Sequence, residues 1–191
     1  DLRHPLTAIL AYAEFLSEGD LGEDQRKDFY QEIRLAVNHM TDELNQLLGF
    51  SKQRSALKPA FVSLSETIER AIQSVQVLPE FHNISIAYSH EGERMVWLDQ
   101  GKLERVMLNL LFNACEAVSP ETGKIEVLSK VTPGEIEIKV SDNGPGIPKD
   151  AQDKIFEAFV QINRQDGPGA KGTGLGLAIV KRILDLHGED I

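Results

Sequence analysis

The chain has 191 residues, of which 41% are hydrophobic and 26% charged, a composition typical of a soluble globular protein rather than a disordered or fibrous one. The net charge is −10, from 20 basic and 30 acidic residues, and acidic residues outnumber basic ones in both 1–58 and 59–191, so nucleic acid is not an expected partner. No apolar run reaches the roughly 18 residues of a membrane span, and the single cysteine, Cys115, excludes a disulfide framework and favours a cytoplasmic location.

The first 58 residues show the hydrophobic spacing of two helices. Apolar side chains recur at steps of three and four in two series, which are Leu2, Leu6, Ile9, Ala13 and Leu16, and then Phe29, Ile33, Val37, Met40, Leu44 and Leu47. This spacing predicts an antiparallel helical hairpin over residues 1–58. Two helices bury little surface by themselves, so we expect two copies to form a homodimeric four-helix bundle, the alternative being packing against the rest of the same chain.

From residue 59 the pattern alternates between helices and strands. We expect helices at 64–77, 100–118 and 174–187, a short helix at 149–157, and strands at 84–88, 95–98, 125–128 and 136–140. Ser65 is a candidate N-cap for the first of these helices. Several adjacent strands look antiparallel, which favours a sheet covered by helices. The predicted class is therefore α+β, with the helical hairpin followed by an α/β sandwich over residues 59–191.

Three segments of the second domain contain residue types suited to a nucleotide. Residues 167–177 are rich in glycine and lead into a helix whose N-terminal amides favour phosphate, although a plain flexible loop has the same composition. Asp142 ends a strand before the turn 143–148, where a carboxylate can accept a hydrogen bond from an exocyclic amine; a surface turn is the alternative. Asn109 and Asn113 share one helix face, and their amide oxygens suit Mg²⁺ unless they are merely satisfied surface amides.

Taken together, these segments resemble the nucleotide-binding motifs of sensor histidine kinases and follow the same order. The resemblance covers about residues 60–191 and rests on an N box at 109–114, a G1 box at 142–148, an F box at 155–159 and a G2 box at 171–180. It implies the Bergerat-type (GHKL) ATP-binding fold, with ATP and Mg²⁺ as ligands.

The resemblance also implies roles for single residues. Asp142 would meet the adenine amino group, and Asn113, helped by Asn109, would hold Mg²⁺. The implied ATP-binding residues are Asn109, Asn113, Asp142, Gly144, Gly146, Lys171, Gly172, Thr173, Gly174, Leu175 and Gly176. Residues 157–173 would form a mobile lid over the nucleotide.

One position of the N box separates phosphoryl transfer from hydrolysis. The same fold serves ATPases of the gyrase, Hsp90 and MutL types, in which a glutamate four residues before the metal-binding asparagine acts as base. Here Asn109 occupies that position, so no carboxylate activates water, whereas a neutral imidazole needs no such base. The resemblance favours a histidine kinase. The alternatives are a hydrolysing GHKL ATPase and a dimeric scaffold that binds nucleotide without turnover.

Residues 1–7 resemble the H box, which carries the phospho-accepting histidine of these kinases. Asp1 aligns with the acidic residue after that histidine, so the acceptor is expected immediately before Asp1, in a chain that reads as trimmed at both ends. Asp1 is then the catalytic candidate that orients the imidazole. The implied reaction is ATP-dependent autophosphorylation, followed by transfer to an aspartate of a response-regulator receiver domain.

Overall fold

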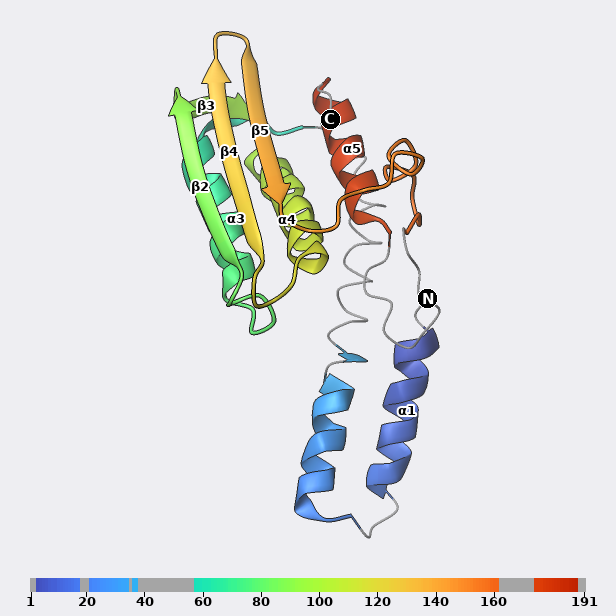
Figure 1. Cartoon of the computed structure of the whole chain (residues 1–191). Helices are drawn as coiled ribbons and strands as arrows, with labels where there is room; N and C mark the ends of the chain where they lie inside the picture. Colours follow the sequence, from blue (N-terminus) through green and yellow to red (C-terminus); the bar gives the residue numbers. More distant parts are fainter. Residues whose placement is uncertain (1–2, 18–20, 35, 38–56, 162–173, 189–191) are drawn as a thin grey trace. The chain divides into compact units, whose positions relative to one another are not determined.

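The computed structural model describes residues 3–17, 21–34, 36–37, 57–161 and 174–188 (Figure 1). The chain divides into two compact units, residues 1–55 and residues 56–191. Within the described ranges, no helix combines the length and the apolar character needed to cross a membrane.

In the described residues of the first unit, two helical stretches are joined by aromatic contacts. Helix α1 is Arg3–Ser17, and residues 23–34 form a second helical stretch. The ring of Phe29 stacks on those of Tyr12 and Phe15, with centroids 5.5 and 5.7 Å apart. The predicted hairpin is confirmed over these residues. Its continuation through Met40, Leu44 and Leu47 lies outside the described residues.

The strands in the described part of the second unit form two sheets. Strands β2 (Ser85–Gly92), β4 (Lys124–Thr132) and β5 (Glu135–Asp142) form a sheet in the order β2-β4-β5. In this sheet β2 runs parallel to β4, and β4 runs antiparallel to β5. Strands β1 (Ala60–Ser63) and β3 (Met95–Leu98) pair antiparallel in a separate sheet. The four predicted strands are confirmed, and β1 is an addition to them.

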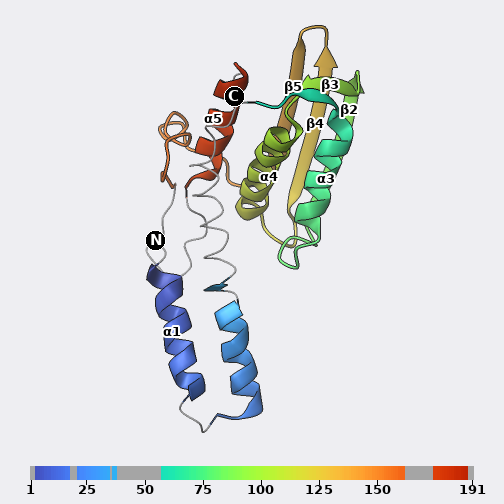
Figure 2. The ribbon, with the colours of Figure 1, turned by 180° about the vertical axis from the view of Figure 1, so that it is seen from behind.

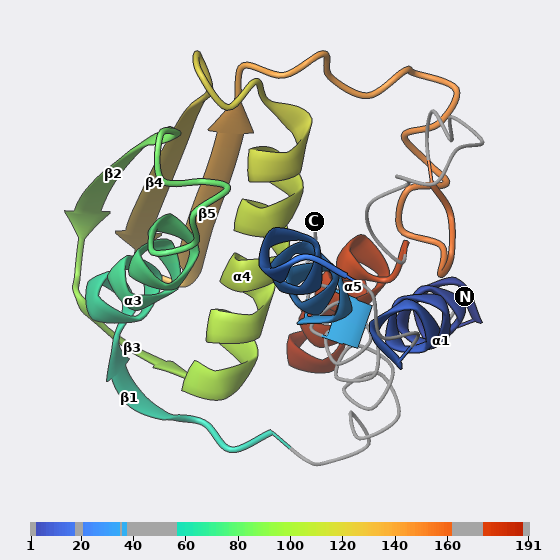
Figure 3. The same ribbon diagram turned by 90° about the horizontal axis from the view of Figure 1, so that it is seen from below.

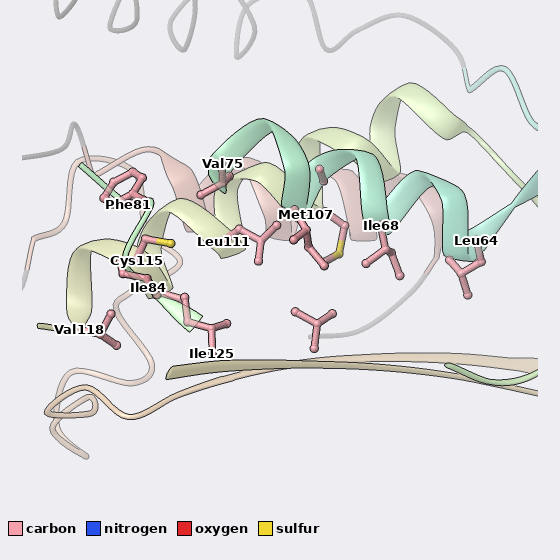
Figure 4. Packing of buried hydrophobic residues seen from close by; sticks show 14 of the residues in the cluster. Leu64, Ile68, Val75, Phe81, Ile84, Met107, Leu111, Cys115, Val118 and Ile125 are labelled. Atoms are coloured by element: carbon pink, nitrogen blue, oxygen red, sulfur yellow. The ribbon is translucent and has the colours of Figure 1, made fainter. Parts of the chain in front are cut away.

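Helices cover one face of the three-stranded sheet. Helices α3 (Leu64–Gln76) and α4 (Gln100–Ala117) lie side by side on it, and α5 (Gly176–His187) packs against α4 (Figures 1 and 2). Seen from below, the sheet, α4 and α5 follow one another as layers (Figure 3). Apolar side chains of α3 and α4 point at the strands (Figure 4), among them Leu64, Ile68, Val75, Met107, Leu111 and Cys115. The predicted α+β class with a helix-covered sheet is confirmed.

Ser63 caps α3, so the predicted cap at Ser65 is wrong. The Ser63 hydroxyl accepts a hydrogen bond from the backbone N–H of Glu66 at 3.3 Å. Ser65 lies inside the first helical turn, where its buried hydroxyl has no hydrogen-bond partner among the described residues. The helix begins at Leu64, as expected, because Leu64 is fully buried and already belongs to its apolar face, so the residue before it is the cap.

Asp99 caps α4 and also binds the chain that enters the unit. Its Oδ1 accepts the N–H of Lys102 at 3.1 Å, and its Oδ2 accepts the N–H of Lys58 at 2.9 Å. Burial alone would raise the pKa of Asp99, but the two amide hydrogen bonds and the charge of Lys102 outweigh it and lower the pKa. The carboxylate is therefore ionised at neutral pH and serves two segments at once.

Residues 149–157 form successive turns, so the predicted short helix is wrong. Most of the turn hydrogen bonds close after three residues, as from Ala151 N–H to Pro148 O at 3.0 Å and from Lys154 N–H to Ala151 O at 2.9 Å. Nine residues make too few hydrogen bonds to sustain an α-helix by themselves. The segment is also held by contacts of Phe156 and Phe159 with residues in and just before α5.

Candidate nucleotide site

Two asparagines form the polar centre of α4. Asn109 donates a hydrogen bond from Nδ2 to the backbone carbonyl of Arg105, one turn earlier, at 2.7 Å. This bond fixes the orientation of the amide and leaves its Oδ1 for other partners. The amide of Asn113 makes no hydrogen bond to any residue in the described ranges. Both side chains are half-buried, so α4 offers two amide oxygens at a partly desolvated position.

Gly176 brings the start of α5 against both asparagines. A Cβ at Gly176 would lie 3.2 Å from Oδ1 of Asn109 and 3.4 Å from Oδ1 of Asn113. The close approach therefore favours a residue without a side chain. Leu175, the N-cap residue, is buried and makes no side-chain hydrogen bond to the helix start. The side chain of the N-cap residue thus does not cap the first amides of α5, and two neutral amide oxygens lie beside them. Free amides suit phosphates and neutral oxygens suit a cation, so the arrangement fits a cation bound to phosphates.

Asp142 lies at the end of β5, beside the C-terminal end of α4. Its Oδ1 accepts the N–H of Gly144 at 2.8 Å, which closes a tight turn. A Cβ on Gly144 would come within 2.7 Å of the carbonyl oxygen of Ala117, the last residue of α4. Gly146 follows with a positive φ of 74° and open space around it. The turn therefore places a carboxylate beside the helix that carries the two asparagines.

Asn143 holds this turn in place, a role that the sequence analysis missed. Its Oδ1 accepts the N–H of Lys124 at 2.8 Å, and its Nδ2 donates to the carbonyl of Thr122 at 3.0 Å. Both bonds tie the turn to the start of β4. Because both ends of its amide bind the backbone of another segment, Asn143 positions its neighbour Asp142.

A backbone hydrogen bond joins Phe159 to Gly174, fifteen residues later in the chain. The N–H of Phe159 donates to the carbonyl of Gly174 at 2.8 Å. Phe159 has a φ of 69°, and no other non-glycine residue in the described part of the chain has a positive φ. Nearby, the ammonium of Lys181 on α5 lies 5.5 Å from the centre of the Phe156 ring. These contacts anchor the F-box segment to the start of α5.

The structure brings together along α4 the predicted site residues Asn109, Asn113, Asp142, Gly144 and Gly176. Gly146 has open space around it, and Gly174 lies against Phe159 instead. Figures 1 and 2 show α4 with the end of β5 on one side and α5 on the other. The described residues of the prediction are Asn109, Asn113, Asp142, Gly144, Gly146, Gly174, Leu175 and Gly176. Those outside the described residues are Asp1, Lys171, Gly172 and Thr173. Arg105 was not predicted, although its position four residues before Asn109 is the signal that could have found it.

Two family models match the chain. The model of the His Kinase A (phospho-acceptor) domain matches residues 1–56, and the model of the histidine kinase-, DNA gyrase B- and HSP90-like ATPase matches residues 98–191. Sensor protein KdpD of Escherichia coli (strain K12) is 33% identical over 197 residues. That match includes all of this chain and 21% of KdpD, so the chain spans about a fifth of the length of this relative.

Solved histidine kinases share the fold. The mycobacterial sensor histidine kinase MprB is 31% identical, with a TM-score of 0.58 over 69% of this chain and 81% of that one. Full-length ShkA, solved in complex with AMPPNP, is 29% identical, with a TM-score of 0.70 over 96% of this chain and 38% of that one. The Bergerat-type fold that the motifs implied is thereby confirmed. On these grounds the chain belongs to the sensor histidine kinase family, as its phospho-acceptor and ATPase-type catalytic segments.

Proposed function

We propose that this chain binds ATP with Mg²⁺ and transfers the γ-phosphoryl group to a histidine placed immediately before Asp1. The observation that carries the proposal is the approach of Gly176 to the amide oxygens of Asn109 and Asn113. A helix start favours phosphate, and neutral oxygen donors favour Mg²⁺, so the two features together fit a magnesium–nucleotide complex. The match of residues 98–191 to an ATPase model supports ATP as that nucleotide.

Each part of the site has a separate task in this proposal. Asp142 accepts a hydrogen bond from the adenine amino group through the carboxylate oxygen that Gly144 leaves free. Asn113 and Asn109 offer amide oxygens to Mg²⁺, which when bound offsets the negative charge of the phosphates. The N-terminal amides of α5 face the same phosphates, and Lys171, Gly172 and Thr173 complete the phosphate contacts.

The transfer itself needs little help from a base. The imidazole nitrogen attacks the γ-phosphorus while the bond from that phosphorus to the bridging oxygen breaks and ADP leaves. Asp1 orients the ring and stabilises its second N–H. Hydrolysis is the less suitable reaction, because the amide nitrogen of Asn109 donates to the Arg105 carbonyl and an amide cannot take a proton from water.

Dimerisation and the partner belong to the same proposal. Residues 1–58 are the dimerisation and phosphotransfer hairpin, and residues 59–191 are the catalytic domain. Leu6, Leu10 and Val37 are exposed on a single chain, which supports burial of the hairpin against a second copy. A response-regulator receiver domain then takes the phosphoryl group onto an aspartate. The family match over residues 1–56 supports this partner, and the need for ATP supports a cytoplasmic location.

A labelling experiment tests the reaction. The chain is extended by one histidine before Asp1 and incubated with [γ-³²P]ATP and Mg²⁺. We expect label in an acid-labile, base-stable bond, and no label when the added residue is glutamine. Asn113→Asp should abolish labelling, because an added negative charge disturbs the Mg²⁺–phosphate geometry. Steady release of phosphate without a labelled protein would instead favour the hydrolysing ATPase.

A pair of glycine variants tests the site. Gly176→Ala places a methyl group 3.2 Å from Oδ1 of Asn109, so the affinity for ATP should fall at least about tenfold while the helix itself is not weakened. Gly101→Ala is the matched control near the start of α4, where the new Cβ would lie 3.6 Å from Oδ1 of Asp99. Equal affinities of the two variants, measured by titration calorimetry, would place the nucleotide elsewhere.

A further inference from the structure

Arg105 lies on the polar face of α4, one turn before Asn109. Arg105, Asn109 and Asn113 recur every four residues, a spacing that puts side chains on one face of a helix. The hydrogen bond from Asn109 Nδ2 to the Arg105 carbonyl, 2.7 Å long, shows that the asparagine side chain leans back over the Arg105 turn. The guanidinium therefore continues the row of polar groups toward the start of α4.

The charge of Arg105 has no anion to balance it in the described part of the chain. Its side chain is half-buried, and none of the described carboxylates forms an ion pair with it. Burial lowers the pKa of Arg105, yet a guanidinium remains protonated at neutral pH. A partly desolvated cation without a partner is unfavourable, and a phosphate matches the planar fork of its N–H donors.

The order of groups along α4 indicates which part of the nucleotide reaches Arg105. Gly144, next to Asp142, packs at Ala117, the last residue of α4. The two asparagines follow toward the middle of the helix, and Arg105 comes one turn later, about 18 Å of helix axis from Ala117. With adenine at Asp142 and the Mg²⁺-bound phosphates at the asparagines, the end of the phosphate chain points toward Arg105.

We propose that Arg105 binds the terminal phosphate of ATP and thereby makes the site prefer ATP to ADP. The inference rests on the proposed function, since it uses the same site and the same direction of the nucleotide. It adds a specificity-determining residue, because ADP lacks the phosphate that Arg105 contacts. Once the γ-phosphoryl group has been transferred, this contact is lost, so ADP dissociates more readily than ATP.

The ratio of the two affinities tests the role of Arg105. Dissociation constants of ATP and ADP, each with Mg²⁺, are measured by titration calorimetry on the 191-residue chain and on Arg105→Gln. We expect the ATP affinity to fall about 10- to 100-fold, the size of a lost charged hydrogen bond, and the ADP affinity to change less than about twofold. Arg105→Lys, which keeps the charge but loses the fork, should show an intermediate loss for ATP.

The control removes the same charge at a distance from the site. Arg70 is exposed on α3, where its Nε donates to the carbonyl of Glu66, so Arg70→Gln should leave both affinities unchanged. Equal losses of ATP and ADP affinity in Arg105→Gln, or no loss, overturn the inference, since a residue that only supports Asn109 affects both nucleotides alike. The ratio does not depend on the fraction of folded protein. An unmodified chain that binds neither nucleotide overturns the proposed function itself.

Discussion

The carbonyl of Gly174 holds Phe159 in a backbone conformation that L-residues rarely adopt. Phe159 has a φ of 69°, is 67% exposed and donates its N–H to Gly174 at 2.8 Å. A bulky residue in the left-handed region costs roughly 1–2 kcal/mol. Such strain persists where surrounding contacts determine it, and it recurs at functional segments. The F-box segment thus keeps an exposed aromatic ring next to the start of α5.

Gly174→Ala should be far more destabilising than an equivalent change elsewhere. Gly174 has a φ of 67°, and a Cβ there would lie 2.8 Å from the carbonyl oxygen of Val160. Gly134 has a φ of 91° but nothing within 4 Å, so Gly134→Ala costs only the conformational penalty of about 1–2 kcal/mol. Urea denaturation should show a larger loss for Gly174→Ala. Equal decreases in the free energy of unfolding would mean that the backbone around Phe159 and Gly174 shifts to accommodate the added methyl group.

The buried thiol of Cys115 makes stability depend on alkaline pH. Burial, together with the charge of Glu116, raises the pKa of Cys115 from 9.0 to about 11. The unfolded chain therefore loses this proton at a lower pH than the folded chain, and the contribution present below pH 9 is lost between about pH 9 and 11. The stability of the native sequence relative to Cys115→Ala should fall by up to about 3 kcal/mol across this range in urea denaturation. A constant difference would contradict the shift.

At the scale of an element, Ser63 and Ser65 provide a matched pair. The Ser63 hydroxyl caps α3, whereas the buried Ser65 hydroxyl has no partner among the described residues. Ser63→Ala should lower the free energy of unfolding by about 1 kcal/mol. Ser65→Ala should leave it unchanged or raise it, because it removes a buried polar atom that lacks a hydrogen bond. Thermal melts of both variants check this, and the reverse order would restore Ser65 as the cap.

How far the sequence predicts these elements depends on what determines them. The strands of the sheet were predictable, because hydrophobic periodicity is a local property of the sequence. Asn109 and Gly176 were assigned to one site only through the resemblance of their motifs to a known family, since their contact joins segments far apart in the chain. Ser65 was two residues from the true cap, since the boundary is decided by burial of Leu64. The turns at 149–157 and the conformation of Phe159 arise from contacts with residues near α5, which no local pattern reports.

At the scale of the whole molecule, the exposed leucines of α1 predict how the chain associates. Leu10 is 57% exposed on a single chain. Leu10→Glu should raise the dissociation constant of the proposed dimer at least about tenfold in sedimentation velocity, because it replaces a leucine that the bundle would bury with a charged side chain. Glu14→Gln, on an exposed position of the same helix, should not. A persistent dimer in Leu10→Glu would move the interface off this face.

The two carboxylate oxygens of Asp99 bind two segments that are far apart in the sequence. One holds the amide of Lys58, where the polypeptide enters the second unit, and the other holds the first turn of α4. Helix α4 carries the two asparagines and Arg105. Through Asp99, its first turn is hydrogen-bonded to the segment of chain at Lys58 that follows the hairpin. A displacement of the chain at Lys58 would therefore reach the first turn of α4, the helix of the proposed nucleotide site, through the side chain of Asp99.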